Sequence, residues 1–440
     1  MFQKSIVYQI MFRNFNSEGT IKSAEKLLPF IKELGTDIVY ITPIWEADDD
    51  ENREFWSPRQ IKSGLNNPKN PYRIKDYYSI DSEYGTMEDL KNFTDTAHSL
   101  GMRVIFDIVY FHCSPKSVMM DMKKEYIVRD ENETPMTGRW CFPMLNFDSD
   151  ALREYLYGNM LYYIKEIGAD GFRCDASDSI PPDFWEEAIK RVRKIKPDAF
   201  FLHEGESEGY MDKGFDANYG FAWMETMQAV FAGLKTTNDL YEAWKKTFDA
   251  NPKGTLVTRS LDTHDVATDG IPISQDTEER KSVQEVFGPD GVDAALVMNY
   301  TIDGIPFLYN GYEIANTSPH SMYSNRFYGK MCTDWSKLQT KEGQERLELV
   351  KNLAKLKHAE NALAFGETLW NTQNDGIVSF IRKYNNEEIH VIVNLTGADF
   401  EMTLSNSETI LLSNKSFTSG NNITISHKGY VVTKNTIWDI

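Results

Sequence analysis

Residues 169–178, ADGFRCDASD, contain an arginine and an aspartate two positions apart, Arg173 and Asp175. If this run forms a β-strand, alternate side chains share a face, so these two would lie next to each other, with Phe172 and Cys174 on the opposite face. A neighbouring arginine and aspartate can form a purely structural ion pair. The arginine can instead keep the carboxylate ionised, as a nucleophile or a general base requires. This run alone leaves both interpretations open.

Further carboxylates and histidines stand at the ends of other strand-like runs, and these are Asp107, His112, Glu204, His264 and Asp265. Gathering such charges only to stabilise a core would be unfavourable, because buried charges are expensive to desolvate. Glycoside hydrolysis requires this kind of set: a carboxylate nucleophile, a second carboxyl group that can hold a proton, and donors for sugar hydroxyls. A metal site is the rival interpretation, but the sequence has no HExxH motif and no closely spaced pair of ligands.

Strand-like runs alternate with helical periodicity along most of the chain. The predicted strands cover residues 5–10, 36–43, 102–109, 170–175, 199–204, 215–219, 255–261 and 305–309. The predicted helices include residues 24–34, 86–100, 152–167, 184–195, 225–248, 283–300 and 345–358, and a loop is expected over residues 44–82. Eight strands with crossover helices favour a closed (β/α)8 barrel, in which catalytic groups lie where the strands end. A nucleotide-binding open sheet is less favoured, because no GxGxxG or GxxxxGK[ST] motif follows any strand.

Two regions depart from this alternation. Residues 113–148, after the third strand, form a short irregular insertion, and from about residue 363 short alternating strands with Asn/Gly turns indicate an antiparallel module. The predicted fold class is therefore α/β. It comprises a (β/α)8 TIM barrel over residues 1–362 and a C-terminal antiparallel, β-sandwich-like domain over residues 363–440.

Composition limits the partners and the cellular compartment. The 440 residues carry a net charge of −19, which disfavours nucleic acid and acidic membranes as partners. No apolar run approaches the ~18 to 20 residues that span a bilayer, and residues 1–10 lack the features of a signal peptide. The four cysteines, Cys113, Cys141, Cys174 and Cys332, are widely spaced and show no zinc-binding pattern. We therefore expect a cytoplasmic protein with reduced thiols.

Several motifs occur in a fixed order at barrel spacing. They are DIVYFH at residues 107–112, GFRCD at 171–175, FLHE at 201–204 and THD at 263–265, with NPYRIKDY at 70–77 and GIPFLYNGYE at 304–313. Together they resemble the conserved motifs of the α-amylase superfamily of glycoside hydrolases, the family 13 type. The resemblance runs from about residue 5 to 360, and the C-terminal β-domain of that family would account for the remainder.

The resemblance implies a retaining double displacement without a cofactor. Asp175 would be the nucleophile, Glu204 the general acid and base, and Asp265 the residue that stabilises the transition state. The residues expected to bind the sugar are Tyr72, by stacking, together with His112, Arg173 and His264. We interpret Asp107 mainly as the partner of Arg173.

Some positions differ from the family pattern. Phe111 stands where the family has an asparagine that often binds calcium, so no metal site is predicted. Thr263 replaces the asparagine of the fourth motif. His203 occupies a position that is usually small, and Asp178 stands where a histidine often follows the nucleophile, which leaves the sugar contacts beyond the cleaved bond open. Glu206 is a possible rival of Glu204 for the acid role.

The predicted function is hydrolysis of α-glucosidic bonds, α-1,4 and conceivably α-1,6, in malto-oligosaccharides or related α-glucans. A transglycosylase or isomerase of the same superfamily, such as a glucanotransferase or trehalose synthase, is the first alternative. A non-catalytic glucan-binding protein is the second, and the intact carboxylates Asp175, Glu204 and Asp265 argue against it. The sequence leaves the linkage preference, the chain-length preference and the oligomeric state open.

Overall fold

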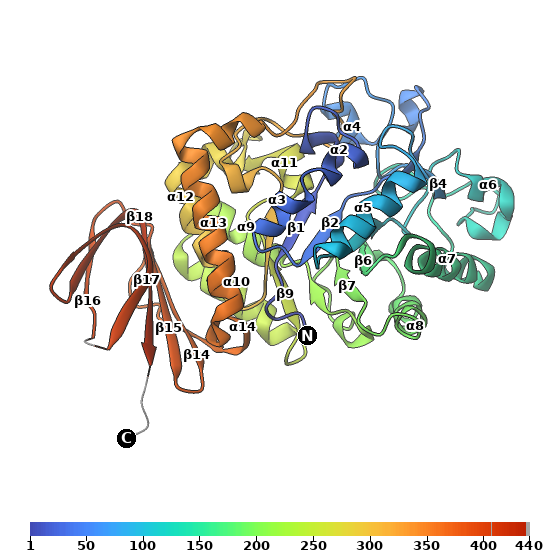
Figure 1. Ribbon diagram of the computed structural model, residues 1–440. Helices are drawn as coiled ribbons and strands as arrows, with labels where there is room; N and C mark the ends of the chain where they lie inside the picture. Colours follow the sequence, from blue (N-terminus) through green and yellow to red (C-terminus); the bar gives the residue numbers. More distant parts are fainter. Residues whose placement is uncertain (406, 437–440) are drawn as a thin grey trace. The chain divides into compact units, whose positions relative to one another are not determined.

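Eight strands form a closed barrel in a computed structural model that describes residues 1–405 and 407–436 (Figure 1). Their order around the barrel is β1-β12-β9-β8-β7-β6-β5-β2. Neighbouring strands run parallel wherever the register is described. The strands are β1 (Val7–Ile10), β2 (Ile38–Ile41), β5 (Arg103–Ile108), β6 (Gly171–Cys174), β7 (Phe200–His203), β8 (Ala217–Asn218), β9 (Leu256–Arg259) and β12 (Ile305–Tyr309). Each lies within a predicted strand segment, so the predicted barrel is confirmed.

Helices follow the strands along the chain. They are α1 (Phe12–Phe15), α2 (Ile21–Glu25), α3 (Leu28–Glu33), α4 (Pro58–Lys62), α5 (Met87–Ser99), α6 (Val118–Met122), α7 (Asp150–Tyr162), α8 (Pro182–Arg193), α9 (Phe221–Phe231), α10 (Thr237–Ala250), α11 (His264–Asp269), α12 (Val283–Thr301), α13 (Lys341–Ala359) and α14 (Asn361–Phe365). Short 3-10 segments are η1 (Arg53–Phe55), η2 (Lys124–Tyr126), η4 (Ser177–Ser179), η5 (Met211–Lys213), η6 (Tyr312–Ile314) and η7 (Trp335–Gln339), and η3 (Tyr163–Ile167) is a π-helical turn that continues α7. The helix predicted over residues 24–34 is two helices, because Pro29 in the first turn of α3 lacks the N–H that a continuous helix needs.

A hairpin occupies part of the segment for which we expected a loop. Strands β3 (Trp45–Ala47) and β4 (Ile74–Ile80) pair in antiparallel fashion, with irregular register on both sides of Glu46. The expectation of an irregular loop throughout residues 44–82 is therefore wrong. The segment contains few alternating apolar positions, so its strands are stabilised by tertiary contacts such as the buried Trp45 and Tyr77 side chains.

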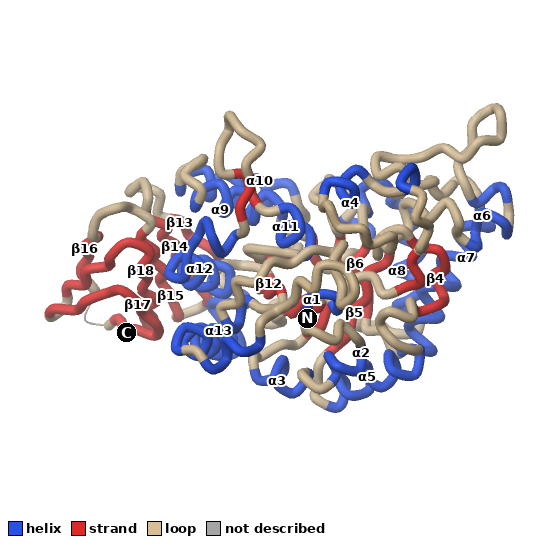
Figure 2. Tube along the Cα trace, turned by 90° about the horizontal axis from the view of Figure 1, so that it is seen from above, coloured by secondary structure: helices blue, strands red, loops and turns tan. Residues whose placement is uncertain are grey.

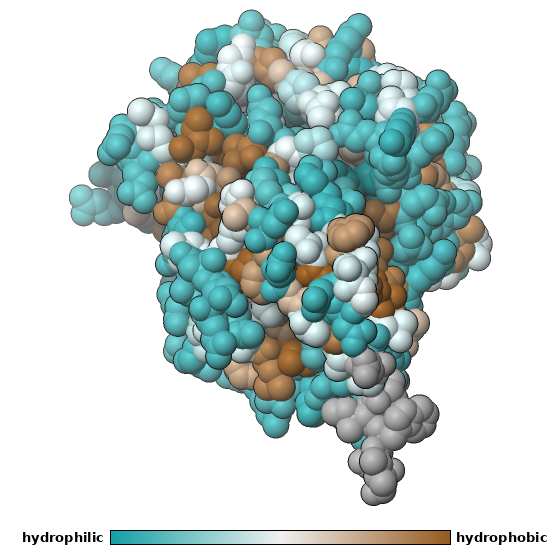
Figure 3. Space-filling model, turned by 90° about the vertical axis from the view of Figure 1, so that its left-hand side faces the viewer, coloured by the Kyte–Doolittle hydropathy of each residue, from teal (hydrophilic) through white to brown (hydrophobic). Residues whose placement is uncertain are grey.

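The C-terminal segment forms the predicted antiparallel sheet, in the order β13-β14-β15-β18-β16, with β17 paired to β18. Its strands are β13 (Glu367–Trp370), β14 (Ile377–Tyr384), β15 (Glu387–Asn394), β16 (Phe400–Thr403), β17 (Glu408–Ser419) and β18 (Asn422–Thr436). Figure 2 shows these strands gathered together, and helices α12 and α14 contact them. Apolar side chains at Ile377, Ile392, Leu404, Ile423, Ile425 and Val431 form one buried core of this sheet. The face drawn in Figure 3 is mostly hydrophilic with scattered apolar patches.

The chain divides into two compact units, which are described separately below. The N-terminal unit comprises residues Val7–Tyr219 and Ser318–Trp335, and the C-terminal unit comprises Met1–Ile6, Gly220–Thr317 and the residues from Ser336 onward. The domain boundary predicted at residue 363 stays a prediction. No helix in the described part of the chain is both long enough and apolar enough to cross a membrane.

Candidate active site

Arg173 lies at the centre of a group of carboxylates in the N-terminal unit. Its Nη1 donates to both carboxylate oxygens of Asp107, at 2.7 and 2.9 Å, and to Asp175 Oδ1 at 2.8 Å. Its Nη2 forms an ion pair with Glu204 Oε1. Burial alone would lower the pKa of Arg173, but the Asp107 and Glu204 carboxylates hold that pKa well above its usual value. One permanently charged guanidinium therefore joins the ends of β5, β6 and β7.

Strand geometry explains why these groups meet. The parallel register places Asp107 beside Arg173 and Arg173 beside Leu202, so that Glu204 follows the adjacent end of β7. Gly171 has a φ of 146°, and a Cβ built on it would collide with the backbone of Phe200. The absence of a side chain at Gly171 therefore lets β6 lie close to β7.

The chain turns sharply after Asp175, and this turn brings the backbone of Ala176 to Glu204. Ala176 adopts the left-handed conformation, with a φ of 44°, and its N–H donates to Glu204 Oε2 at 2.5 Å. Both oxygens of the Glu204 carboxylate thus have defined partners, the Arg173 guanidinium and the Ala176 amide. The side chains of Asp175 and Glu204 are mostly buried, with 9% and 15% of their surface exposed.

Asp107 also accepts hydrogen bonds from two tyrosines. Its Oδ2 accepts from the Tyr40 hydroxyl at 2.7 Å and from the Tyr72 hydroxyl at 3.0 Å, and its carbonyl oxygen accepts from Trp45 Nε1 at 3.1 Å. The contact with Arg173 agrees with our interpretation of Asp107. Sequence reasoning missed Tyr40 and left Trp45 aside. One feature of the sequence could have indicated Tyr40: its hydroxyl is a lone polar group in an otherwise aliphatic strand.

His112 is a neutral, buried imidazole. Its Nε2 lies 2.9 Å from the Tyr72 carbonyl oxygen, and its ring packs against Trp140 and Phe142. Burial lowers the pKa of His112 to about 4, so the ring is uncharged at neutral pH. Because Nε2 donates to the carbonyl, Nδ1 is left as an acceptor, and it has no hydrogen-bond partner among the described residues.

His264 and Asp265 lie in the C-terminal unit, where α11 begins after β9. Thr263 caps this helix by accepting from the Val266 N–H. His264 is fully buried, and its Nε2 lies 3.3 Å from Asp265 Oδ2, while about a third of the Asp265 side chain is exposed. The N-terminal unit thus brings together Tyr72, His112, Arg173, Asp175 and Glu204, and His264 and Asp265 form a pair within the other unit.

Asp262, directly before the fourth motif, is a titratable residue that sequence reasoning missed. It is buried, and it accepts from the Tyr312 hydroxyl at 2.6 Å and from the Thr263 N–H at 2.8 Å. Burial raises the pKa of Asp262 to about 7, although both hydrogen bonds act in the opposite direction. Its position after a strand was visible in the sequence, but its burial depends on the packing of Tyr312.

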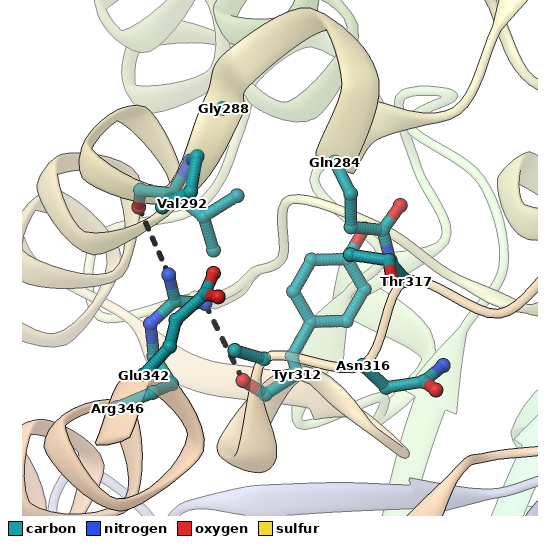
Figure 4. A pocket seen from close by; sticks show the side chains of 10 residues that line it. Gln284, Gly288, Val292, Tyr312, Asn316, Thr317, Glu342 and Arg346 are labelled. Carbon is teal, nitrogen blue, oxygen red and sulfur yellow. Dashed lines mark hydrogen bonds between the residues drawn. The ribbon is translucent and has the colours of Figure 1, made fainter. Parts of the chain in front are cut away.

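Tyr312, whose hydroxyl donates to Asp262, also lines a small cavity in the same unit. Figure 4 shows its ring among the residues around this cavity. Arg346 lines this cavity and donates to the carbonyl oxygens of Tyr312 and Pro289. The cavity holds about 30 Å³, which is roughly the room that one water molecule occupies. The cavity is therefore too small for a sugar. Arg346 on its wall holds the segment that carries Tyr312.

The chain matches the family model of the α-amylase catalytic domain over residues 6–135. It is 22% identical to α-amylase 2 of Dictyoglomus thermophilum, over 95% of this chain and 74% of that protein. It is 25% identical to the intracellular maltogenic amylase of Bacillus subtilis, over 83% of this chain and 60% of that protein. Residues 6–135 and these relatives therefore make the chain similar to the α-amylase family of glycoside hydrolases.

The fold agrees with this similarity. A maltogenic α-amylase of Thermotoga neapolitana superimposes with a TM-score of 0.80 at 22% identity, over 99% of both chains. The chain spans only part of the relatives that it matches in sequence, 60% in the case of the Bacillus subtilis protein.

Residue 111, at which the α-amylase family often has a calcium-binding asparagine, is apolar in this chain. The Phe111 ring packs edge-on against His112 and Trp140. Among the described residues, no three or more His, Cys, Asp or Glu side chains are grouped so that they could hold a metal ion.

Proposed function

We propose that this chain hydrolyses α-glucosidic bonds in soluble malto-oligosaccharides, with retention of anomeric configuration. The observation that carries the proposal is the shared contact of Arg173 with Asp175 and Glu204. Retaining glycosidases need two carboxyl groups close together, about 5 to 5.5 Å apart, with one acting as nucleophile and the other as acid and base. A guanidinium that contacts both groups favours such a spacing.

In the first step, an Asp175 oxygen attacks the anomeric carbon as the bond to the leaving oxygen breaks. Glu204 gives its proton to that oxygen, and a covalent glycosyl-enzyme results. In the second step, Glu204 takes a proton from water, the water oxygen attacks the anomeric carbon, and Asp175 is released as a carboxylate. The enzyme returns to its starting protonation state.

The other predicted residues would act on the sugar itself. Asp265 would stabilise positive charge that develops at the anomeric centre. Neutral His112, together with His264, would offer hydrogen bonds to hydroxyl groups, and Tyr72 would stack on the ring in the cleaved position. A cytoplasmic location is part of the proposal. It is supported by the name of the Bacillus subtilis relative, an intracellular maltogenic amylase.

Product analysis with maltoheptaose tests the proposal. The wild type should release shorter products of the maltose series, and Asp175→Ala should release none. Proton NMR of the first products should show the α-anomer, because two inversions retain configuration. Products longer than the substrate would instead indicate transglycosylation. A wild type inert on α-1,4 and α-1,6 glucosides, sucrose and trehalose would leave the binding-protein interpretation.

A second experiment assigns the acid. Glu204→Gln should lose activity on maltoheptaose but still release a first-turnover burst of fluoride from maltosyl fluoride, because fluoride leaves without a proton. Turnover after the burst should be slow, because the second step lacks its base. Glu206→Gln is the matched control, because it makes the same change two residues away. If Glu206→Gln showed the selective loss instead, the acid role would belong to Glu206.

A further inference from the structure

The His203 ring contacts two consecutive residues of the turn that follows the nucleophile candidate. Its Nδ1 lies 2.6 Å from Ser177 Oγ, and its Nε2 lies 2.8 Å from Asp178 Oδ1. His203 directly precedes Glu204 in the chain. One imidazole therefore joins the segment of Asp175 to the segment of Glu204.

Serine, histidine and aspartate in this order invite comparison with a nucleophilic triad. Ser177, however, is fully buried, as is His203. A hydroxyl that no substrate can reach is not a nucleophile, so we interpret the arrangement as one that positions its neighbours.

Two aromatic rings fix the orientation of the imidazole. Tyr210 stacks on His203 with ring centres 4.9 Å apart, and Phe215 packs against it at 5.0 Å. The Tyr210 hydroxyl donates to the carbonyl oxygens of Asp178 and Ile180, at 2.9 and 3.0 Å. The segment after Glu204 therefore returns to the turn that His203 already contacts.

The Asp178 carboxylate also contacts the residues that follow Glu204. Burial would raise its pKa, but hydrogen bonds from His203, the Ser207 side chain and the Glu206 backbone lower it below its usual value. Gly205 leaves room for this carboxylate, because a Cβ built there would collide with it. Gly205 does not have a positive φ, so the collision, and not backbone strain, is what excludes a side chain.

We propose that His203 and Asp178 are positioning residues that set the place of Glu204 relative to Asp175. This inference rests on the proposed function. Glu204 is held in two ways. Its side chain accepts from the Ala176 N–H. On either side of it in the chain, the His203 ring contacts Ser177 and Asp178, and the Glu206 backbone bonds to Asp178. All three attachment points directly follow Asp175. The family resemblance leads us to expect a sugar-binding histidine at position 178. The residue there is Asp178, and its carboxylate contacts His203 instead.

The hydrogen bonds define the tautomer that this role requires. When Nε2 carries the proton and faces Asp178, Nδ1 accepts from the Ser177 hydroxyl. The same hydroxyl lies 3.3 Å from the Glu204 carbonyl oxygen, but it has a single hydrogen to donate. With the proton of the ring on Nε2, Nδ1 of His203 therefore accepts that hydrogen.

Steady-state kinetics of three variants tests the inference. His203→Gln keeps a donor toward Asp178, His203→Asn keeps a polar atom toward Ser177, and Asp178→Asn keeps the shape of Asp178 without its charge. We expect each to lower kcat on maltoheptaose about 10- to 100-fold, because a displacement of ~1 Å in a catalytic group has effects of this size, with KM changed less than about threefold. The loss in the first-turnover burst of fluoride from maltosyl fluoride should be clearly smaller, because the first step on that substrate does not need the proton of Glu204.

The matched control is His98→Asn. His98 Nε2 forms a comparable contact of 2.7 Å with Asp170, next to the opposite end of β6. This variant should lose stability without a selective effect on maltoheptaose, and circular dichroism with urea unfolding shows that each variant is folded.

The outcomes separate the two proposals. If the wild type is inert on every glucoside, the proposed function fails and this inference fails with it. If the wild type is active and the folded His203 and Asp178 variants match it within twofold, the inference alone is overturned. Equal losses on maltoheptaose and in the fluoride burst from maltosyl fluoride would also overturn it, because they would show general damage to the site.

Discussion

Asp262 makes the stability of the protein depend on pH in a defined direction. The folded protein keeps the proton of Asp262 up to about pH 7, whereas an exposed aspartate loses it at about pH 4. Between these values the unfolded chain binds fewer protons than the folded one, so the free energy of unfolding falls as the pH rises. The stabilisation from this group is complete below about pH 4, declines to about pH 7 and is then absent.

We expect Asp262→Asn to remove this decline, because asparagine resembles the protonated carboxyl group in shape. Between pH 4.5 and 8, the wild type should lose on the order of 3 kcal/mol relative to the variant, since each pH unit is worth about 1.4 kcal/mol. Urea unfolding at both pH values measures the difference. Asp276→Asn, at an exposed position of the same unit, is the control. It should change the free energy of unfolding by the same amount at pH 4.5 and at pH 8. A parallel pH dependence in wild type and Asp262→Asn would contradict the assignment.

At the same scale, the sequence predicted some contacts of the site and missed others. The contact between Arg173 and Asp175 follows from strand alternation, which a sequence displays directly. The hydroxyl of Tyr40 on Asp107 joins β2 to β5, and the pairing register of two distant strands is not visible in a single sequence. The same reason explains why the contacts of His203 were not foreseen, although its unusual position was noted.

At the scale of elements, sequence reasoning succeeded where local chemistry decides. The capping box at Thr86 and Asp89 starts α5 as predicted, with each side chain bonding to the backbone of the other. Largely apolar runs predicted most of the barrel strands. The β3–β4 hairpin was missed because its stability comes from contacts with residues far away in the chain, among them the stacked rings of Trp45 and Tyr163.

Gly171 allows a prediction about β6 as an element. Gly171→Ala should lower the free energy of unfolding by about 2 kcal/mol or more, because the new Cβ meets the Phe200 backbone at an unfavourable φ. Activity on maltoheptaose should fall by more than the loss of folded protein explains. The collision would push β6 away from β7, and Arg173 on β6 would then lie farther from Glu204, which follows β7. Urea unfolding and initial rates provide the two measurements.

Gly158→Ala is the matched control for this prediction. Gly158 lies inside α7, and a Cβ there would make only an ordinary contact with Tyr78. Replacing a glycine inside a helix by alanine should stabilise it by up to about 1 kcal/mol. If Gly171→Ala behaved like Gly158→Ala, close approach of β6 and β7 would not be required.

At the scale of the whole molecule, Asp303 connects many parts of the C-terminal unit. Its carboxylate accepts from Arg259 Nη2 at 3.1 Å and from Trp244 Nε1 at 2.7 Å, and Arg382 of β14 lies 3.7 Å away. Burial and the nearby Arg382 lower the pKa of Lys357 to about 7. A barrel strand, two helices and the antiparallel sheet therefore meet around one carboxylate.

Asp303→Asn should destabilise the protein by on the order of 3 kcal/mol, because two buried guanidinium groups lose their carboxylate. Asp290→Asn is the control, since its ion pair with Lys415 is largely exposed and should contribute less than about 1 kcal/mol. Urea unfolding of both variants measures the contrast. Equal effects would show that Asp303 acts as an ordinary surface charge.

The interdependence of Asp178, His203 and Gly205 restricts how this protein can change over evolution or be redesigned. Glycine at 205 leaves room for the Asp178 carboxylate, and Nε2 of His203 contacts that same carboxylate. A single exchange toward a small residue at 203 or a histidine at 178 leaves the other two mismatched. A stepwise route to a different sugar contact at this position therefore passes through variants with impaired activity. Libraries that vary the three positions together should find active combinations that stepwise selection would discard.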